Sequence, residues 1–322
     1  MKRSFTALLI LGSLCVGAQT VLAADTYPTR PIRWIVPYPP GGTTDILARL
    51  MGQWLSERLN QQVLIDNRPG AGNNIGTEIA VRSTPDGYTV FLVNPANAIN
   101  ATLYSKLPFN FLNDMAPIGG MVRVPNVMEV TNSLPAKSIP EFIAYAKANP
   151  TKVILASSGA GTSVHLSGEL FMSMTGIKMT HVPYKGAGPA LPDLIGGQVH
   201  VMFDNMPSSI EFIRGGKLRA LGVTTAKRSA QLPNVPTVAE TVPGYEASAW
   251  FGMSGPKGIP ANVVAILNRE MNAALADPKM KARFADLGGD PIPGTPAEFW
   301  KIHTYETEKW AKVVKASGAK VD

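Results

Sequence analysis

Short apolar segments alternate with amphipathic segments along most of the chain, and this alternation limits the fold more than any other feature. Residues 32–38 form an apolar run, and in residues 44–59 that follow, Leu47, Met51 and Leu55 recur at helical spacing. Strands joined through helices build mostly parallel sheets, so the sequence predicts an α/β fold. The expected strands are residues 32–38, 63–66, 88–93, 127–130, 153–156, 179–184, 199–203, 219–224 and 250–254.

Helix start signals support the same fold class. Ser138 and Glu141 form a capping box, and Thr295 and Glu298 form another with Pro296 at the first helical position. We therefore expect long helices late in the chain as well as between the strands. The expected helices are residues 44–59, helices that end near residues 83, 148, 174, 195 and 214, and residues 261–276, 278–287 and 296–316.

The alternation weakens in two places, and this divides the chain. Around residues 110–125 the periodicity fades, and residues 226–247 form a polar loop that contains several prolines. We interpret both as crossings between two domains, since roughly 300 residues are enough for two cores. The expected division is a first domain of residues 24–122 and 226–322, and a second domain of residues 123–225.

The first 23 residues have the pattern of an export signal. Lys2 and Arg3 precede an apolar run at residues 5–17, which is too short to span a membrane, and small residues follow at 21–23. The sequence therefore predicts secretion into the periplasm, with a mature chain that begins near Ala24.

Cysteine content and charge exclude several classes of function. The single cysteine, Cys15, lies in the signal, where the bulky Leu14 before it argues against a lipid anchor. The mature chain then has no thiol for a disulfide or a cysteine metal site. The formal net charge is +7, but no block of five or six like charges indicates nucleic-acid or membrane-surface binding. The mild positive charge either attracts an anion or is only a basic surface.

Glycine-rich turns stand between expected strands and helices at four places, namely Gly41-Gly42, Gly70 to Gly72, Gly159 to Gly161 and Gly186 to Gly188. Such a turn leaves backbone N–H groups free at the positive end of a helix, and glycine lets a ligand approach them closely. In open α/β sheets these turns lie at the carboxyl ends of strands, where ligands bind. Turn geometry alone explains any one of them. Four turns, two in each domain, predict that at least two bind an anion.

Motifs for nucleotide binding, catalysis and metal binding are missing from the sequence. The segment Gly70 to Gly76 has one residue too many for the dinucleotide fingerprint, and there is neither a Gly-Lys-Ser/Thr phosphate loop nor a Gly-x-Ser-x-Gly elbow. The four histidines do not have metal-ligand spacing. We therefore expect no cofactor, no metal and no enzymatic activity.

Five side chains near the turns each have two open interpretations. His165 either donates to a bound carboxylate or is structural. Asp45 lies near a helix start, where an acid is favoured by the dipole, and this outweighs a ligand role. Asp204 ends a strand and either accepts from an amino or hydroxyl group of a ligand or caps the next helix. Tyr38 and Trp250 either wall a pocket or belong to the core.

Segments along essentially the whole mature chain, in order, resemble one family. Two of them are Asn67-Arg-Pro-Gly-Ala-Gly72 and Val182-Pro-Tyr-Lys-Gly-Ala187. The others are residues 27–49, 85–89, 194–199, 216–220, 227–229 and 232–237. No single segment is diagnostic, but the ordered set resembles the Bug family, the TctC-like substrate-binding proteins of tripartite tricarboxylate transporters.

That resemblance implies a two-lobed fold of the periplasmic-binding-protein type II (Venus flytrap) class, in which each lobe is a mostly parallel sheet flanked by helices. The ligand would lie between the lobes, held partly through ordered water by turns 40–45 and 157–162. Ala160 departs from the asparagine or glycine of many relatives and predicts a small apolar wall. The ligand-binding residues expected from the turns and the resemblance are Tyr38, Pro40, Gly41, Gly42, Thr43, Thr44, Asp45, Asn94, Ser157, Ser158, Gly161, Thr162, His165, Asp204 and Trp250.

The resemblance also implies a function and partners. The chain would bind a di- or tricarboxylate, an acidic amino acid or an aromatic acid and deliver it to the large and small membrane subunits of a tripartite transporter. We expect a monomer that binds no nucleic acid. Two alternatives stay open: a ligand-sensing module that docks on a sensor kinase, and a secreted α/β enzyme that acts on carboxylates.

Overall fold

A ten-stranded mixed sheet runs through the centre of the molecule, with the order β2-β1-β3-β9-β4-β7-β5-β6 and with β8 and β10 paired to β4. The computed structural model describes residues 27–317 and residue 321, so the expected export signal and Cys15 lie outside the described residues. The strands are β1 (Ile32–Val36), β2 (Val63–Asn67), β3 (Thr89–Val93), β4 (Met115–Thr131), β5 (Ile154–Ser157), β6 (Thr180–Pro183), β7 (Val201–Asn205), β8 (Leu218–Val223), β9 (Ser248–Pro256) and β10 (Asp290–Pro291).

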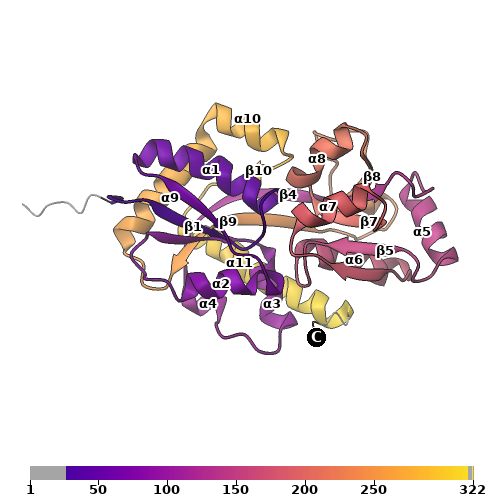
Figure 1. Cartoon of the computed structure of the whole chain (residues 1–322), viewed down its shortest axis with the longest axis horizontal. Helices are drawn as coiled ribbons and strands as arrows, with labels where there is room; N and C mark the ends of the chain where they lie inside the picture. Colours follow the sequence, from indigo (N-terminus) through magenta and orange to yellow (C-terminus); the bar gives the residue numbers. More distant parts are fainter. Residues whose placement is uncertain (1–26, 318–320, 322) are drawn as a thin grey trace, which may run out of the picture.

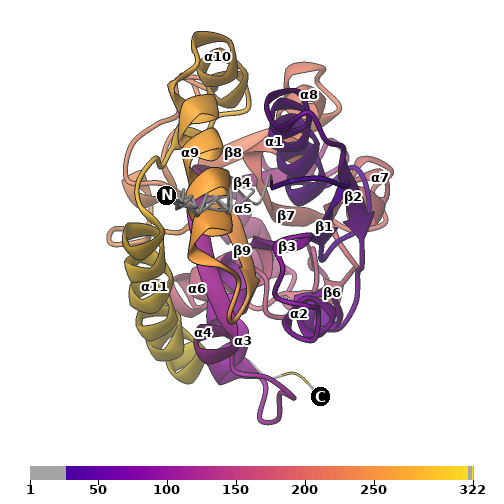
Figure 2. The same ribbon diagram turned by 90° about the vertical axis from the view of Figure 1, so that its left-hand side faces the viewer.

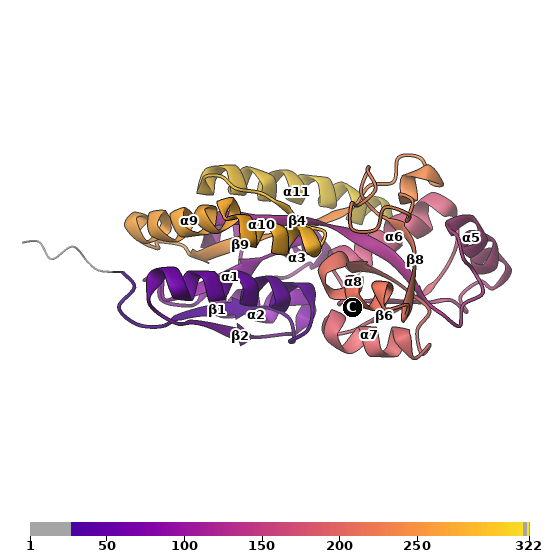
Figure 3. The ribbon, with the colours of Figure 1, turned by 90° about the horizontal axis from the view of Figure 1, so that it is seen from above.

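One long strand, β4, joins two halves of the sheet (Figure 3). Its 17 residues pair with β9 and β10 at one end and with β7 and β8 at the other, always antiparallel. The first half contains β1, β2, β3, β9 and β10, and the second half contains β5 to β8. The backbone passes between the halves as a strand at β4, so the two halves share hydrogen bonding along one ladder.

Helices cover both faces of the first half (Figure 1). In the side view, α9 and α11 run along one edge of the molecule, and β1 and β2 lie toward the other (Figure 2). Helix α1 buries Leu47, Met51 and Leu55 against the sheet, as its apolar spacing predicts. The helices of this half are α1 (Thr43–Leu59), α2 (Asn74–Val81), α3 (Pro95–Leu103), α4 (Phe111–Asp114), α9 (Ala261–Ala276), α10 (Pro278–Asp286) and α11 (Pro296–Ser317), with the 3₁₀ turn η1 (Ala71–Asn73).

The second half alternates strands and helices in the same way. Strand β5 lies parallel to both β6 and β7, and helices connect them. Ser138 begins the first of these helices, where its side chain accepts a hydrogen bond from the backbone N–H of Glu141. The helices are α5 (Ile139–Ala148), α6 (Ser163–Thr175), α7 (Ala187–Ile195) and α8 (Met206–Arg214), and the 3₁₀ turn η2 (Val238–Glu240) lies in the return connection.

The α/β class and the repeated strand–helix pattern are confirmed, and the differences have physical reasons. The segment 110–125 lies largely in β4, where Pro117, Gly119 and Gly120 hide the strand pattern and the register shifts twice. The sequence indicated only a crossing between domains here, and the strand that forms the crossing was not predicted. Helix α3 was not expected either. Several strand pairs are also antiparallel. Strands β8, β9 and β10 pair in this way with β4, the strand that crosses between the halves, and β3 pairs in this way with β9.

Candidate functional site

Five helices begin around one pocket between the two halves. Each of α1, α3, α6, α7 and α8 follows a strand of the sheet, so the turns from β1, β3, β5, β6 and β7 meet at the carboxyl ends of those strands. The space between the lining side chains, including its opening to solvent, is about 380 Å³. The lining residues are Tyr38, Gly42, Thr43, Thr44, Asn94, Pro95, Ser158, Thr162, Ser163, Val164, Ala187, Asp204, Asn205 and Phe251.

Backbone N–H groups supply the positive character of this pocket. The amides of Thr43 and Thr44 in α1 and of Ser163 and Val164 in α6 have no hydrogen-bond partner among the described residues. The N-terminus of α7, at Ala187, faces the same space without a side-chain cap. No lysine, arginine or histidine of the described residues lines the pocket. An anion there would be held by helix termini rather than by an ion pair.

The turn before α1 is fixed by Asp45, which lies behind it. Its Oδ2 accepts from the backbone N–H of Gly41 at 3.0 Å and from Arg49 Nε at 3.0 Å, and Asn67 donates to Oδ1. Burial alone would raise the pKa of Asp45, but the hydrogen bonds from Arg49, Gly41 and Asn67 outweigh it and lower the pKa. Asp45 therefore stays ionised, and the Gly41 amide is occupied.

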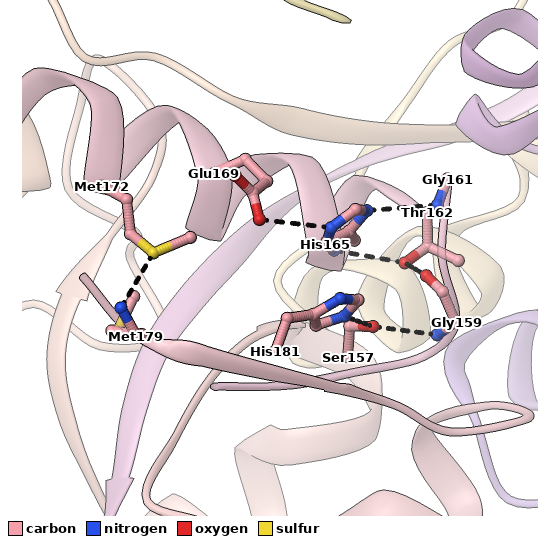
Figure 4. Close-up of polar contacts among 9 residues, drawn as sticks. All are labelled: Ser157, Gly159, Gly161, Thr162, His165, Glu169, Met172, Met179 and His181. Carbon is pink, nitrogen blue, oxygen red and sulfur yellow. Dashed lines mark hydrogen bonds and ion pairs between the residues drawn. The ribbon is translucent and has the colours of Figure 1, made fainter. Parts of the chain in front are cut away.

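The turn before α6 is fixed by a cluster of polar side chains (Figure 4). Thr162 Oγ1 donates to the carbonyl of Gly159 at 2.7 Å and accepts from the backbone N–H of His165 at 3.2 Å, which makes it the N-cap of α6. Ser157 Oγ accepts from the Gly159 amide at 3.2 Å. The Gly161 amide donates to His165 Nδ1 at 3.3 Å. This turn is therefore held from behind, and its front faces the pocket at Ser158 and Thr162.

Two stacked imidazoles lie under that turn (Figure 4). The rings of His165 and His181 lie 4.0 Å apart at 13°. His165 Nδ1 accepts from Gly161, so its proton is on Nε2, which lies 3.4 Å from Glu169 Oε1. His181 Nε2 lies 2.7 Å from Ser157 Oγ. Burial, with a contribution from His165, lowers the pKa of His181 to about 3, so that this ring is neutral at physiological pH.

The opposite wall of the pocket carries a chain of hydroxyls that ends on a buried acid. Thr43 Oγ1 of α1 lies 2.9 Å from Ser208 Oγ of α8, and Ser208 Oγ donates to Asp204 Oδ2 at 2.5 Å. Burial raises the pKa of Asp204 to about 6, although hydrogen bonds from Ser208 and Ser209 and the nearby Asn205 amide lower it in part. The chain joins the two halves directly, because Thr43 belongs to the first half and Ser208 to the second.

Glycines let the halves come together around the pocket. A Cβ on Gly188 would lie 2.5 Å from the carbonyl oxygen of Pro40, and a Cβ on Gly161 would lie 2.1 Å from Asn100 Oδ1. Both contacts cross from one half to the other. Only a residue without a side chain allows these approaches, so the structure shows the halves in close contact around the pocket.

The structure brings eight of the fifteen expected site residues to the pocket lining. They are Tyr38, Gly42, Thr43, Thr44, Asn94, Ser158, Thr162 and Asp204. Six others support the turns without lining the pocket: Pro40, Gly41, Asp45, Ser157, Gly161 and His165.

Trp250 is the one expected residue that points elsewhere. It is fully buried against Phe299 and His303, with ring distances of 6.0 and 5.3 Å. The next residue, Phe251, lines the pocket instead, because successive side chains of a strand point to opposite faces.

Six lining residues were not expected from the sequence. The start of α6 would have found two of them, since Ser163 and Val164 occupy the first two positions after its N-cap. Phe251 alternates with Trp250 along β9, and the sequence of the strand does not show which of the two faces the pocket. The full set is Pro95, Ser163, Val164, Ala187, Asn205 and Phe251.

The described part of the chain contains neither a cluster of metal-binding side chains nor a helix that could span a membrane. Within residues 27–317, no three histidine, cysteine, aspartate or glutamate side chains gather as a metal ion would require. No helix described there is both long enough and apolar enough to cross a membrane.

The fold and its pocket define a class of protein, the two-lobed periplasmic solute-binding proteins. A solved structure of R. palustris Rpa4515 with adipate has a TM-score of 0.90 and 39% identity, and covers 92% of this chain and 100% of its own. The structure of the periplasmic binding protein BugD has a TM-score of 0.88 and 34% identity, and the match covers 91% of this chain and 99% of that one. The structure of MatC (Rpa3494) from Rhodopseudomonas palustris with bound malate has a TM-score of 0.86 and 29% identity, and the match covers 89% of this chain and 100% of that one.

Sequence comparison defines the family within this class. The family model described as "Tripartite tricarboxylate transporter family receptor" matches residues 47–319. Protein BugT of Bordetella pertussis is 40% identical over 308 residues, which cover 95% of this chain and 94% of BugT. The chain belongs to the TctC family of tripartite tricarboxylate transporter receptors, which includes the Bug proteins. The family resemblance predicted from the sequence is confirmed.

Proposed function

We propose that this protein captures a small carboxylate in the periplasm and delivers it to the membrane subunits of a tripartite transporter. The family supports the role of a receptor, and two relatives of similar structure hold the carboxylates adipate and malate. The ligand belongs to the dicarboxylates, tricarboxylates, acidic amino acids or aromatic acids. The export signal expected in residues 1–23 and the periplasmic relative BugD support the location.

The observation that carries this proposal is the convergence of helix N-termini on a pocket without basic side chains among its described lining residues. Unpaired amides of α1 lie on one side and those of α6 on the other. A carboxylate has two oxygens with four lone pairs, so it can accept from both helices at once. Helix termini bind anions without the desolvation penalty of a buried ion pair.

Lobe closure is the mechanism that follows. In this proposal, residues 27–122 and 226–317 form one lobe and residues 123–225 form the other. A ligand that contacts Thr43 and Thr44 in one lobe and Ser158 and Thr162 in the other binds the closed form more tightly than the open form, and therefore shifts the population toward closure. The closed monomer then presents one shape to the transporter, and neither a metal nor a cofactor takes part.

Binding without turnover is also part of the proposal. Ser157 and His181 resemble a nucleophile and its base, at 2.7 Å. However, Ser157 is fully buried, does not line the pocket, and already accepts from the Gly159 amide. We expect a bound acid to be recovered unchanged after long incubation, as measured by mass spectrometry.

A thermal-shift screen of the mature protein against carboxylates tests the proposal. The panel contains citrate, four- to six-carbon dicarboxylates, acidic amino acids, nicotinate and phthalate. A ligand at 100 times its Kd stabilises a protein by about 2.7 kcal/mol, which raises the Tm by several degrees. We expect a rise with one chemical class. If folded protein freed of carried-over ligand shows no rise with any acid, the proposal is wrong.

Thr44→Val removes a hydroxyl that lines the pocket and makes no hydrogen bond within the described residues. Because no protein partner is lost, we expect the Tm without ligand to stay within about 1 °C and the Kd to rise about tenfold, the loss of one hydrogen bond to a charged group. Isothermal titration calorimetry measures the Kd, and the thermal melt without ligand measures the Tm. The matched control is Thr304→Val on the exposed face of α11, which should leave the Kd unchanged.

A further inference from the structure

A second buried carboxyl group, that of Glu129, lies close to Asp204, the acid that lines the pocket. Glu129 of β4 and Asp204 of β7 are both buried, at 0% and 1% exposure. Ser209 Oγ of α8 stands between them, 2.7 Å from Glu129 Oε1 and 2.9 Å from Asp204 Oδ2. The two acids therefore share one hydroxyl, and among the described residues no basic side chain pairs with either of them.

Counting hydrogens shows how this triad is arranged. A serine hydroxyl has one proton, so Ser209 can donate to only one of its two carboxyl neighbours. The other short contact needs a proton from a carboxyl group. Asp204 Oδ2 is in contact with two hydroxyls, those of Ser208 and Ser209, although Ser208 Oγ also lies 2.9 Å from the carbonyl oxygen of Asn205. Glu129 has only Ser209, and its Oε2 has no partner among the described residues, so Asp204 is the better stabilised as a carboxylate. The consistent arrangement is a protonated Glu129 that donates to Ser209, and a Ser209 that donates to an ionised Asp204. Burial first, and then repulsion from Asp204, raises the pKa of Glu129 well above its usual range.

One carboxylate oxygen of Asp204 has no hydrogen-bond partner within the described residues. Its Oδ2 accepts from Ser208 and Ser209, but Oδ1 is buried and has no hydrogen-bond partner within the described residues. Asp204 itself lines the pocket. A buried carboxylate oxygen without a partner is unfavourable, and in a binding pocket a donor from the ligand would relieve this.

We propose that Asp204 is a specificity-determining residue that selects carboxylates bearing a hydroxyl or amino group, and that protonated Glu129 is the positioning residue that keeps Asp204 as an acceptor. This inference rests on the proposed function and narrows its ligand class. The carboxylate of the ligand occupies the helix N-termini, and its hydroxyl or ammonium group donates to Asp204 Oδ1. A ligand that offers only a second carboxylate to Asp204 meets a like charge.

The protonation state of Asp204 decides whether it accepts a hydrogen bond from a ligand or donates one. Its neighbours on α8 are the hydroxyls of Ser208 and Ser209, and Ser208 in turn contacts the hydroxyl of Thr43 on α1. From β4 it faces Glu129, and the charge of Asp204 helps to raise the pKa of Glu129. Below a pH of about 6 Asp204 takes up a proton and becomes a donor. The preference for ligand donors should then disappear, and plain dicarboxylates should gain.

Calorimetry with matched ligands tests this inference. The probes share a carbon skeleton and differ in one group: succinate, malate and aspartate; glutarate, 2-hydroxyglutarate and glutamate; benzoate and its 2-hydroxy and 2-amino derivatives. For the skeleton that binds, we expect the hydroxyl or amino derivative to bind at least about tenfold more tightly than the parent at pH 7.5. The ratio should fall toward one at pH 5.

Two variants separate selection from folding. Asp204→Asn should reduce the preference to about twofold or less and remove its dependence on pH. Glu129→Gln should keep the preference, because its amide N–H donates to Ser209 as the carboxyl proton does. If the parent acid binds as tightly as its derivatives, or if Asp204→Asn keeps the pH-dependent preference, the inference is overturned while the proposed function stands. Loss of the preference in folded Glu129→Gln would overturn the role of Glu129. If no carboxylate binds the wild-type protein, both proposals fail.

Discussion

At the scale of single residues, hydrogen-bond assignment decides which groups are free for a ligand. Gly41 and Gly161 both belong to glycine-rich turns, and both were expected to offer amides. In the structure Asp45 accepts from one of them and His165 from the other. The amides that stay free are those of the following helical residues, such as Thr43 and Ser163. The turns therefore act as rigid supports, and the first turn of each helix faces the ligand.

Buried histidine far from the pocket gives a prediction about acid stability. His303 is fully buried, stacks on Phe111 at 4.8 Å, and has no partner for its Nε2 within the described residues. Burial lowers the pKa of His303 to about 3. The unfolded chain, with an ordinary pKa near 6.5, takes up a proton first, so stability is lost as the pH falls from about 6.5 toward 3.

His303→Phe should remove this part of the acid sensitivity. Phenylalanine keeps the stacking on Phe111 and Trp300 and cannot be protonated. The free energy of unfolding of the wild type should fall relative to that of the variant by about 1.4 kcal/mol for each pH unit below 6.5. Urea denaturation at pH 7.5, 6 and 5 measures the difference. A difference that stays constant over this range would show that folding does not lower the pKa of His303.

At the scale of elements, a single side chain determines how α6 begins. Thr162 caps the helix through its hydroxyl and holds the carbonyl of Gly159. Thr162→Val keeps the branched shape but loses both hydrogen bonds, so we expect a loss of about 1 to 2 kcal/mol in the free energy of unfolding. Thr162→Ser, which retains the hydroxyl, should lose less than half as much. Urea denaturation without ligand measures both variants. Equal losses would mean that the methyl group, not the cap, stabilises the turn.

The elements with a clear apolar period could be predicted from the sequence, and those without it could not. Strand β1 and helix α1 show their periods openly, and their bounds differ from the expected ones by at most two residues. In β4, glycines and prolines interrupt the alternation, and both faces of the strand are buried, so no polar residues mark its period. Helix α3 contains two asparagines and has a third as its N-cap, and asparagine is a poor helix former in isolation. Tertiary hydrogen bonds, such as Asn100 to Gly72 at 2.7 Å, stabilise it instead.

The pocket was predictable as a place but not in its side-chain detail. Glycine turns after strands located it, because the carboxyl ends of parallel strands meet at one edge. The choice between Trp250 and Phe251 depends on which face of β9 points to the pocket, and the local sequence of β9 does not determine this. Glu129 was not expected because it lies in the middle of an apolar segment and contributes through Asp204, which is distant in sequence.

At the scale of the whole molecule, glycine contacts let the two halves close, and this gives the last prediction. Gly188 lies in the first turn of α7, where alanine fits the helical backbone. Its added Cβ would lie 2.5 Å from the carbonyl oxygen of Pro40, a backbone atom of the opposite half. Gly188→Ala should therefore leave each half folded but oppose their approach. Since the ligand must bridge both halves, closure becomes unfavourable and affinity falls by about tenfold or more.

Small-angle X-ray scattering with and without the carboxylate found in the screen measures this effect directly. In the wild-type protein the ligand should reduce the radius of gyration, because it shifts the population toward the closed form. In Gly188→Ala the reduction should be smaller at equal ligand saturation, while the Tm without ligand stays near that of the wild type. The control is Gly196→Ala at the end of the same helix, whose Cβ meets only Pro192 and Asp193 of its own half. If Gly188→Ala closes as fully as this control and binds as tightly, the contact between α7 and the Pro40 turn is not part of the closed state, and closure must take place about other contacts.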